Sequence, residues 1–209
     1  LEPDAKTTGT VPLIKGILAG FKERGFAVGG FDAFTTSNVI SAAGVSSSAS
    51  FEMLICSILN YFFNDNKMTV TNYAHAGRYA ENVYWKKASG LLDQMACACG
   101  GVVTIDFADN ENPKVEKIDF SLDAIGCDLL SVNTGKGHAN MSDEYSAVPV
   151  EMKKAAAYFG KEVLAEVPYE KFMEEIPRLR TALGDRCVMR ALHFYSENAR
   201  VDEEVAALK

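Results

Sequence analysis

Residues 44–52, GVSSSASFE, place three consecutive serines directly before an apolar helical pattern. One serine is enough to cap a helix, so three suggest a further need for hydroxyl and N–H groups. The first N–H groups of a helix lack intrahelical partners and lie at the positive end of its dipole. The segment therefore favours an anion site, most naturally for phosphate, with Ser46, Ser47 and Ser48 offering hydroxyls to phosphate or magnesium. A serine-rich N-cap without a ligand is the alternative.

Two carboxylates further along the chain could serve such a site. Glu81 lies within AEN, residues 80–82, and alone it would be interpreted as a surface group. Asp93 is more unusual, because apolar residues surround it in GLLDQMA, residues 90–96. It is either an exposed gap in an apolar face or a buried group held for chemistry. No Walker lysine follows the serines, so this is a different kind of phosphate loop.

Hydrophobic periodicity predicts the elements that position these residues. Apolar residues at helical spacing predict helices over 11–24, 47–63, 71–85, 89–100, 143–160 and 184–208. Aromatic and β-branched segments predict strands over 31–40, 102–107, 114–120 and 125–134. In the helix over 47–63, the expected buried face is Phe51, Leu54, Ile55, Ile58, Leu59 and Phe62. The charged stretch before the last helix has room for one short helix. The fold class is α+β, with antiparallel pairing across 102–120.

Composition limits the classes of function. The 209 residues, 48% of them apolar, suit one large or two small domains, and the glycines at 100–101 mark the expected boundary. A net charge of −7 argues against bulk binding to nucleic acid or anionic membranes. No apolar run approaches the ~20 residues of a membrane span, and no secretory segment opens the chain. The expected location is the cytoplasm. Three histidines and five cysteines without a Cys-x-x-Cys pair make a zinc site improbable.

Five segments, in order along the chain, resemble the galactokinases of the GHMP small-molecule kinase superfamily. They are GVSSSASFE (44–52), AEN (80–82), SGLLDQ (89–94), SDEY (142–145) and RALHFYSENARV (190–201). The resemblance implies the two-domain GHMP-kinase fold, incomplete in this chain. Residues 1–100 would be part of the N-terminal, ATP-binding domain, and residues 101–209 part of the ferredoxin-like C-terminal domain.

The resemblance also implies roles for single residues. The loop that wraps the ATP phosphates would be Gly44, Val45, Ser46, Ser47, Ser48 and Ala49. Ser48 and Glu81 match the magnesium-holding positions. Asp93 matches the aspartate beside the sugar hydroxyl that receives the γ-phosphate, and Gly90 and Tyr145 match sugar contacts. The implied reaction uses ATP as co-substrate and Mg²⁺ as cofactor, and converts α-D-galactose to galactose 1-phosphate with release of ADP.

Two family segments do not occur in this sequence. One is the Arg-x-Asn-x-Ile-Gly-Glu-His-x-Asp-Tyr motif, and the other is a Gly-Gly-Gly-Phe-Gly-Gly-type loop. The chain is therefore expected to be an internal piece of a galactokinase, inactive alone and able to self-associate through exposed core faces. Alternatives are a kinase for N-acetylgalactosamine or arabinose, or a non-catalytic sensor of galactose and ATP. The intact Ser48-Ala49-Ser50 run favours an enzyme over the sensor.

Two lysines after the AEN segment leave a further question open. Lys86 and Lys87 could attract ATP electrostatically, or they could form a solvated turn. The sequence alone does not separate these two interpretations.

Overall fold

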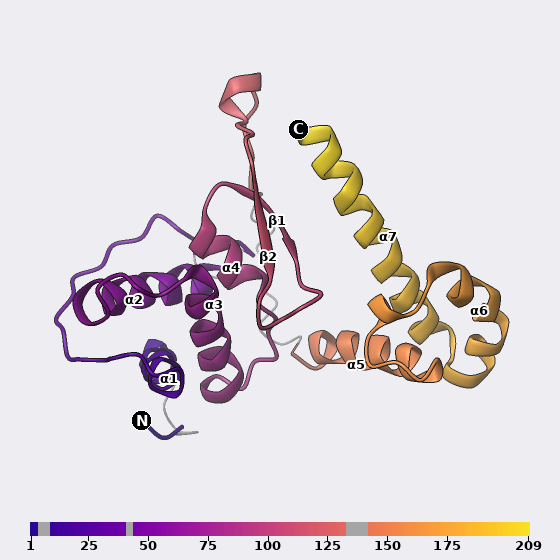
Figure 1. The fold of residues 1–209 in the computed structure, drawn as a ribbon, viewed down its shortest axis with the longest axis horizontal. Helices are drawn as coiled ribbons and strands as arrows, with labels where there is room; N and C mark the ends of the chain where they lie inside the picture. The colour runs from indigo at the N-terminus through magenta and orange to yellow at the C-terminus, as the bar shows by residue number, and fades with distance from the viewer. Residues whose placement is uncertain (4–8, 41–43, 133–141) are drawn as a thin grey trace. The chain divides into compact units, whose positions relative to one another are not determined.

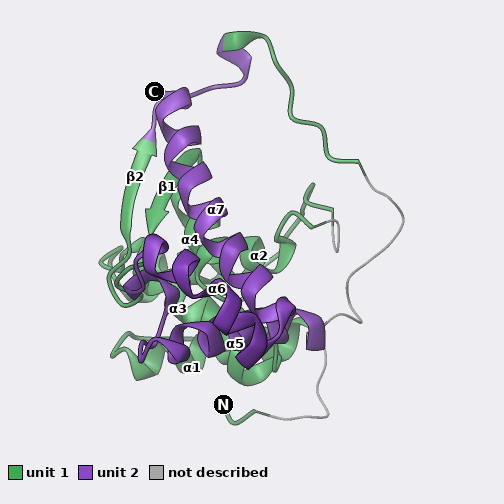
Figure 2. Ribbon diagram, turned by 90° about the vertical axis from the view of Figure 1, so that its right-hand side faces the viewer, with its two compact units in different colours: residues 1–117, 125–140 green, residues 118–124, 141–209 purple. Residues whose placement is uncertain are grey.

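The computed structural model describes residues 1–3, 9–40, 44–132 and 142–209 of the chain (Figure 1). These residues divide into two compact units, which Figure 2 colours separately. Unit 1 comprises residues 1–117 and 125–140, and unit 2 comprises residues 118–124 and 141–209. The serine loop and both predicted carboxylates belong to unit 1.

Unit 1 is built from helices and one small sheet. Its elements are α1 (Thr10–Glu23), α2 (Ser47–Phe63), α3 (Val70–Tyr79), the π-helical turn η1 (Ala80–Tyr84), α4 (Leu92–Cys99), β1 (Val102–Asp106) and β2 (Lys114–Ile118). The four helices predicted for this region are confirmed. Gly25, with a left-handed φ of 80°, follows the end of α1 as expected of a C-terminal glycine. The helix predicted over 71–85 finishes in the wider η1 turn.

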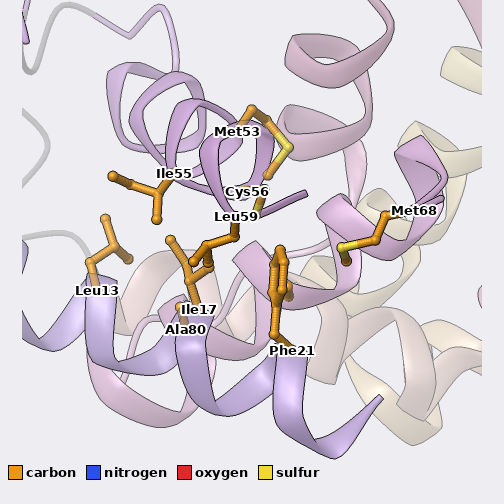
Figure 3. Packing of buried hydrophobic residues seen from close by; sticks show 10 residues of the cluster. Leu13, Ile17, Phe21, Met53, Ile55, Cys56, Leu59, Met68 and Ala80 are labelled. Atoms are coloured by element: carbon orange, nitrogen blue, oxygen red, sulfur yellow. The ribbon is translucent and has the colours of Figure 1, made fainter. Parts of the chain in front are cut away.

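The core of unit 1 lies between α1, α2 and the helix that α3 and η1 form together (Figure 3). Leu13, Ile17 and Phe21 recur every four residues along α1 and are fully buried. They pack in one cluster with side chains of α2 and with Ala80 of η1. Burial of this apolar stripe fixes α1 against the turn that carries Glu81.

The buried face of α2 differs from the predicted one. Leu54 and Phe62 are exposed, although the sequence pattern placed them inside. The residues of α2 that are buried are Ala49, Glu52, Met53, Ile55, Cys56, Leu59 and Asn60. Ile55 and Leu59 of the predicted face are buried and Phe51 and Ile58 are partly buried, so the prediction is confirmed in part. The helix has apolar residues on most of its circumference, so periodicity alone did not define the edges of the buried face.

The strand predictions succeed only where two strands can pair. β1 and β2 form a two-stranded sheet, and their short connection over 107–113 requires the antiparallel arrangement. The predicted strand over 31–40 is wrong: this segment has no regular structure, and Phe34 is 95% exposed. The prediction over 125–134 is also wrong for its described residues, which begin in the 3₁₀ turn η2 (Asp123–Ile125). Among the described residues, neither segment has a strand to supply ladder hydrogen bonds.

Unit 2 is helical in its described part. It contains α5 (Ser142–Tyr158), η3 (Leu164–Glu166), α6 (Tyr169–Leu183) and α7 (Asp185–Leu208). Phe172 and Leu179 of α6 pack against Val188 and Ala191 of α7. The Tyr195 hydroxyl donates to the Val167 carbonyl at 2.8 Å. The short helix expected before α7 is in fact the 15-residue α6. With the sheet of unit 1, the chain is α+β, as predicted. None of the helices in the described ranges combines the length and apolar character needed to cross a bilayer.

Gly16 of α1 provides a test of the packing against η1. A Cβ atom at Gly16 would lie 2.6 Å from Ala80 Cα and 2.7 Å from Ala80 Cβ. We predict that Gly16→Ala lowers the free energy of unfolding by about 1–3 kcal/mol, because backbone blocks the added methyl group. Helix propensity alone would raise stability by about 1 kcal/mol. Urea denaturation distinguishes the two results.

Gly20→Ala is the matched control on the same helix. Its added Cβ would lie 3.2 Å from the nearest atom, Ala76 Cα, so a smaller cost is expected. If Gly16→Ala is as stable as wild type, or more stable, α1 and η1 are not in close backbone contact.

Candidate active site

The amino end of α2 has no side-chain cap. Ser46, its N-cap residue, has a left-handed backbone with φ 54° and ψ 43°, and its side chain makes no capping hydrogen bond. The first N–H groups of α2 therefore receive no capping hydrogen bond from the Ser46 side chain, and like those of any helix they have no intrahelical acceptor. A left-handed conformation costs an L-residue about 1–2 kcal/mol, and such strain is concentrated at functional sites.

The remaining residues of the predicted phosphate loop are small or exposed. Gly44 has a φ of 76° and is exposed, as is Val45. Ser46, Ser47 and Ser48 are half-buried, while Ala49 is buried and anchors the first turn. Residues 41–43, which precede this loop, lie outside the described residues.

Glu81 forms the buried centre of the site. Its side chain is 1% exposed, so the interpretation of Glu81 as a surface carboxylate is wrong. Ser48 Oγ donates a hydrogen bond to Glu81 Oε1 at 2.9 Å. The structure thus brings together the two residues predicted to hold magnesium, although metal binding by them stays a prediction. Their contact joins the amino end of α2 to η1.

Lys87 contacts the same oxygen of Glu81. Its Nζ lies 2.8 Å from Glu81 Oε1, in an ion pair between a 47% exposed lysine and the buried carboxylate. Burial alone would raise the pKa of Glu81, but hydrogen bonds from Lys87, Ser89 and Ser48 and the charge of Lys87 outweigh it. The resulting pKa is lowered, so Glu81 is an anion at neutral pH.

Gln94 of α4 links Glu81 to a second buried carboxylate, Glu52 of α2. Gln94 Nε2 lies 3.1 Å from Glu52 Oε2 and 3.3 Å from Glu81 Oε2, and donates to both. Burial and the neighbouring negative charge of Glu81 raise the pKa of Glu52 to about 8. The pair therefore contains one neutral and one ionised carboxyl group at pH 7.

The sequence analysis missed Glu52 and Gln94. A signal was present, because Glu52, Cys56 and Leu59 follow i, i+4, i+7 spacing and share the buried side of α2. A glutamate in such a row must be neutralised or paired.

For the predicted sugar-binding residues, the structure gives the element on which each lies and its exposure. Asp93 lies in the first turn of α4 and is exposed, so of the two alternatives it is the exposed gap in an apolar face and not the buried group. It directly precedes Gln94, which fixes α4 to Glu52 and Glu81. Gly90 is exposed in the preceding loop. Tyr145 is exposed on α5 of unit 2, and its sugar contact stays a prediction.

The donor set suits magnesium better than a transition metal. In the described part of the chain, no three His, Cys, Asp or Glu side chains cluster as a metal site would require. Magnesium in phosphate-transfer sites needs only one or two carboxylates, with phosphate oxygens and water completing its shell. Glu81 and the Ser48 hydroxyl offer hard oxygen ligands of that kind.

Comparison with known proteins places this geometry in a family context. Residues 12–101 match the family described as GHMP kinases N terminal domain. The chain is 33% identical to a galactokinase from Streptomyces coelicolor over 196 residues, which cover 93% of this chain and 49% of the relative. It is 30% identical to a Clostridium tetani galactokinase, covering 90% of this chain and 47% of the relative. For a Pyrococcus furiosus galactokinase the values are 31%, 95% and 53%. The chain spans about half the length of these curated relatives.

The neutral state of Glu52 predicts a pH dependence of stability. Because its pKa is about 8 in the fold against 4.5 in the unfolded chain, the folded state holds a proton that the unfolded state releases. The stability from this proton is complete below pH 4.5 and is lost as pH rises to about 8. Between pH 5 and 8.5, we expect wild type to lose about 1–4 kcal/mol more than Glu52→Gln, which mimics the neutral acid.

Urea denaturation at both pH values provides the measurement. Glu162→Gln, at an exposed position in unit 2, is the control and should follow wild type. Parallel pH profiles for wild type and Glu52→Gln would mean that Glu52 is ionised in the fold.

Proposed function

We propose, from the match of residues 12–101 to the GHMP kinases N terminal domain, that this chain takes part in phosphoryl transfer from ATP to the C1 hydroxyl of α-D-galactose. The products are galactose 1-phosphate and ADP, and the reaction belongs to the cytoplasm. Because the chain spans about half of each relative, the proposal concerns the activity to which these residues contribute. The observation that carries it is the hydrogen bond from Ser48 to buried Glu81 at the amino end of α2.

The amino end of α2 binds the phosphates of ATP in this proposal. Its first N–H groups and the hydroxyls of Ser46 and Ser47 offer hydrogen bonds to the anion, while the Ser48 hydroxyl donates to Glu81 and keeps its lone pairs for a metal ion. Ser48 and Glu81 would hold Mg²⁺, which neutralises charge on the transferring phosphoryl group when bound. The ionised state of Glu81 is the state that such a ligand requires.

Asp93 orients the acceptor sugar. An exposed carboxylate can accept a hydrogen bond from the C1 hydroxyl and take up its proton as the phosphoryl group transfers. Gln94, its neighbour on α4, contacts Glu81, so the acceptor and phosphate parts of the site share one support. Gly90, in the loop before α4, contributes a further sugar contact.

Asp93→Asn tests the assignment in the complete gene product. We expect galactose-dependent release of ADP to fall at least about 100-fold, because the amide cannot take up the hydroxyl proton. Calorimetric binding of ADP should change less than about threefold, since no nucleotide contact is removed. Asp202→Asn, an exposed change of the same kind on α7, should retain full turnover.

Two results would contradict the proposal. One is unchanged turnover in Asp93→Asn, and the other is ATP turnover that does not depend on galactose. A panel containing galactose, N-acetylgalactosamine and arabinose assigns the sugar. The 209-residue chain assayed alone should show no turnover, because the two family segments named above are not in its sequence.

A further inference from the structure

Lys87 lies beside the two residues predicted to hold magnesium, Ser48 and Glu81. Its ammonium nitrogen and the Ser48 hydroxyl oxygen both lie within 2.9 Å of one carboxylate oxygen, Glu81 Oε1. Ser48 is in the first turn of α2, so Lys87, which follows η1 in the sequence, reaches the amino end of that helix. We propose that Lys87 is a phosphate-binding residue for the nucleotide, held in place by Glu81.

The turn that carries Lys87 is closed by hydrogen bonds at its base. Asn82 and Ser89 pair through both groups of the Asn82 amide. Its Oδ1 accepts from Ser89 N at 2.8 Å, and its Nδ2 donates to Ser89 O at 3.2 Å. These contacts fix residues 83–88 as a closed loop. A merely solvated turn would not require this closure.

The backbone within the loop also directs Lys87 to Glu81. The π-helical turn η1 ends at Tyr84, and Lys86 then adopts a left-handed conformation with φ 57°. After this reversal, Lys87 N donates to the Glu81 carbonyl at 3.0 Å. Lys87 is thus bound to Glu81 through both its backbone and its side chain. The strain at Lys86 is an observed outlier of the kind associated with functional sites.

The ammonium group has capacity left for a ligand. Lysine carries three donors, and the ion pair with Glu81 Oε1 uses one of them. The side chain is 47% exposed, so its nitrogen is reachable from solvent. The same nitrogen lies beside Ser48, whose hydroxyl oxygen contacts the same Glu81 oxygen at the amino end of α2. Lys87 compensates the charge of Glu81 and offers donors to phosphate oxygens beside the N–H groups of α2.

This inference rests on the proposed function, since it assumes that a nucleotide binds at α2. Lys86 provides the matched control: it is exposed, adjacent in sequence, and carries the same charge. Lys86→Met and Lys87→Met change the net charge equally. Lys87→Arg retains a cation at the site.

The test is calorimetric titration of this chain with ADP and with adenosine, in EDTA, so that phosphate contacts are measured without a metal ion. Lys87→Met should weaken ADP binding about tenfold, the size expected for one charge-assisted hydrogen bond. Adenosine, which has no phosphate, should bind all variants within about twofold of wild type. Lys86→Met should bind ADP as wild type does, and Lys87→Arg should recover most of the lost affinity.

The outcomes separate the two claims. If wild type binds ADP and Lys87→Met matches Lys86→Met, Lys87 is not a phosphate ligand, while the proposed function stands. If Lys87→Met weakens ADP and adenosine equally, Lys87 only supports the fold, and the inference is overturned. If wild type binds neither ligand, the proposed function fails and the inference fails with it. Lys87→Gln replaces Lys87→Met in this comparison if the methionine variant does not fold.

Discussion

A buried carboxylate must be paired, and the candidate site of unit 1 is organised around this requirement at Glu81. Three separate elements supply its partners: α2 through Ser48, the loop after η1 through Lys87, and α4 through Gln94. Removing one partner of a buried charge typically costs several kcal/mol, because the remaining charge loses both water and its compensation. Through these contacts Glu81 connects the predicted phosphate loop, the π-helical turn and the Asp93-bearing helix α4.

The second buried carboxylate makes this arrangement asymmetric. Glu52 is neutral because burial and the charge of Glu81 raise its pKa, whereas Glu81 is ionised because donors surround it. Gln94 donates a hydrogen bond to each group, so the neutral and the ionised carboxyl group share one amide. The negative charge is thereby located on the side of the network that faces Ser48 and the positive end of the α2 dipole.

Regular helices were predictable from the sequence, because an apolar stripe and a terminal glycine are local signals. The beginning of α2 at Ser47 and the end of α1 before Gly25 follow directly from such signals. Strands depend on a partner, so the aromatic segment over 31–40 resembled a strand although no described segment pairs with it.

The side-chain network was less accessible. The resemblance to galactokinases supplied Ser48 and Glu81 as a pair, but their surroundings depend on geometry that the sequence does not display. Lys87 reaches Glu81 only because of a π-helical turn and a left-handed residue that is not glycine. Glu52 was not predicted as a site residue, because apolar residues surround it in the sequence. The same apolar residues led to Leu54 and Phe62 being assigned to the buried face of α2.

The proposed function requires the amino end of α2 and Glu81 to bind a metal–nucleotide complex together. The most direct measurement is paramagnetic broadening of backbone amide signals in the ¹⁵N-labelled chain by Mn²⁺·ADP, with Mg²⁺·ADP as the diamagnetic reference. The account predicts that the amides of Ser46, Ser47, Ser48 and Glu81 broaden first and most strongly. Broadening centred on other residues, with the amides of Ser46–Ser48 unaffected, would contradict it.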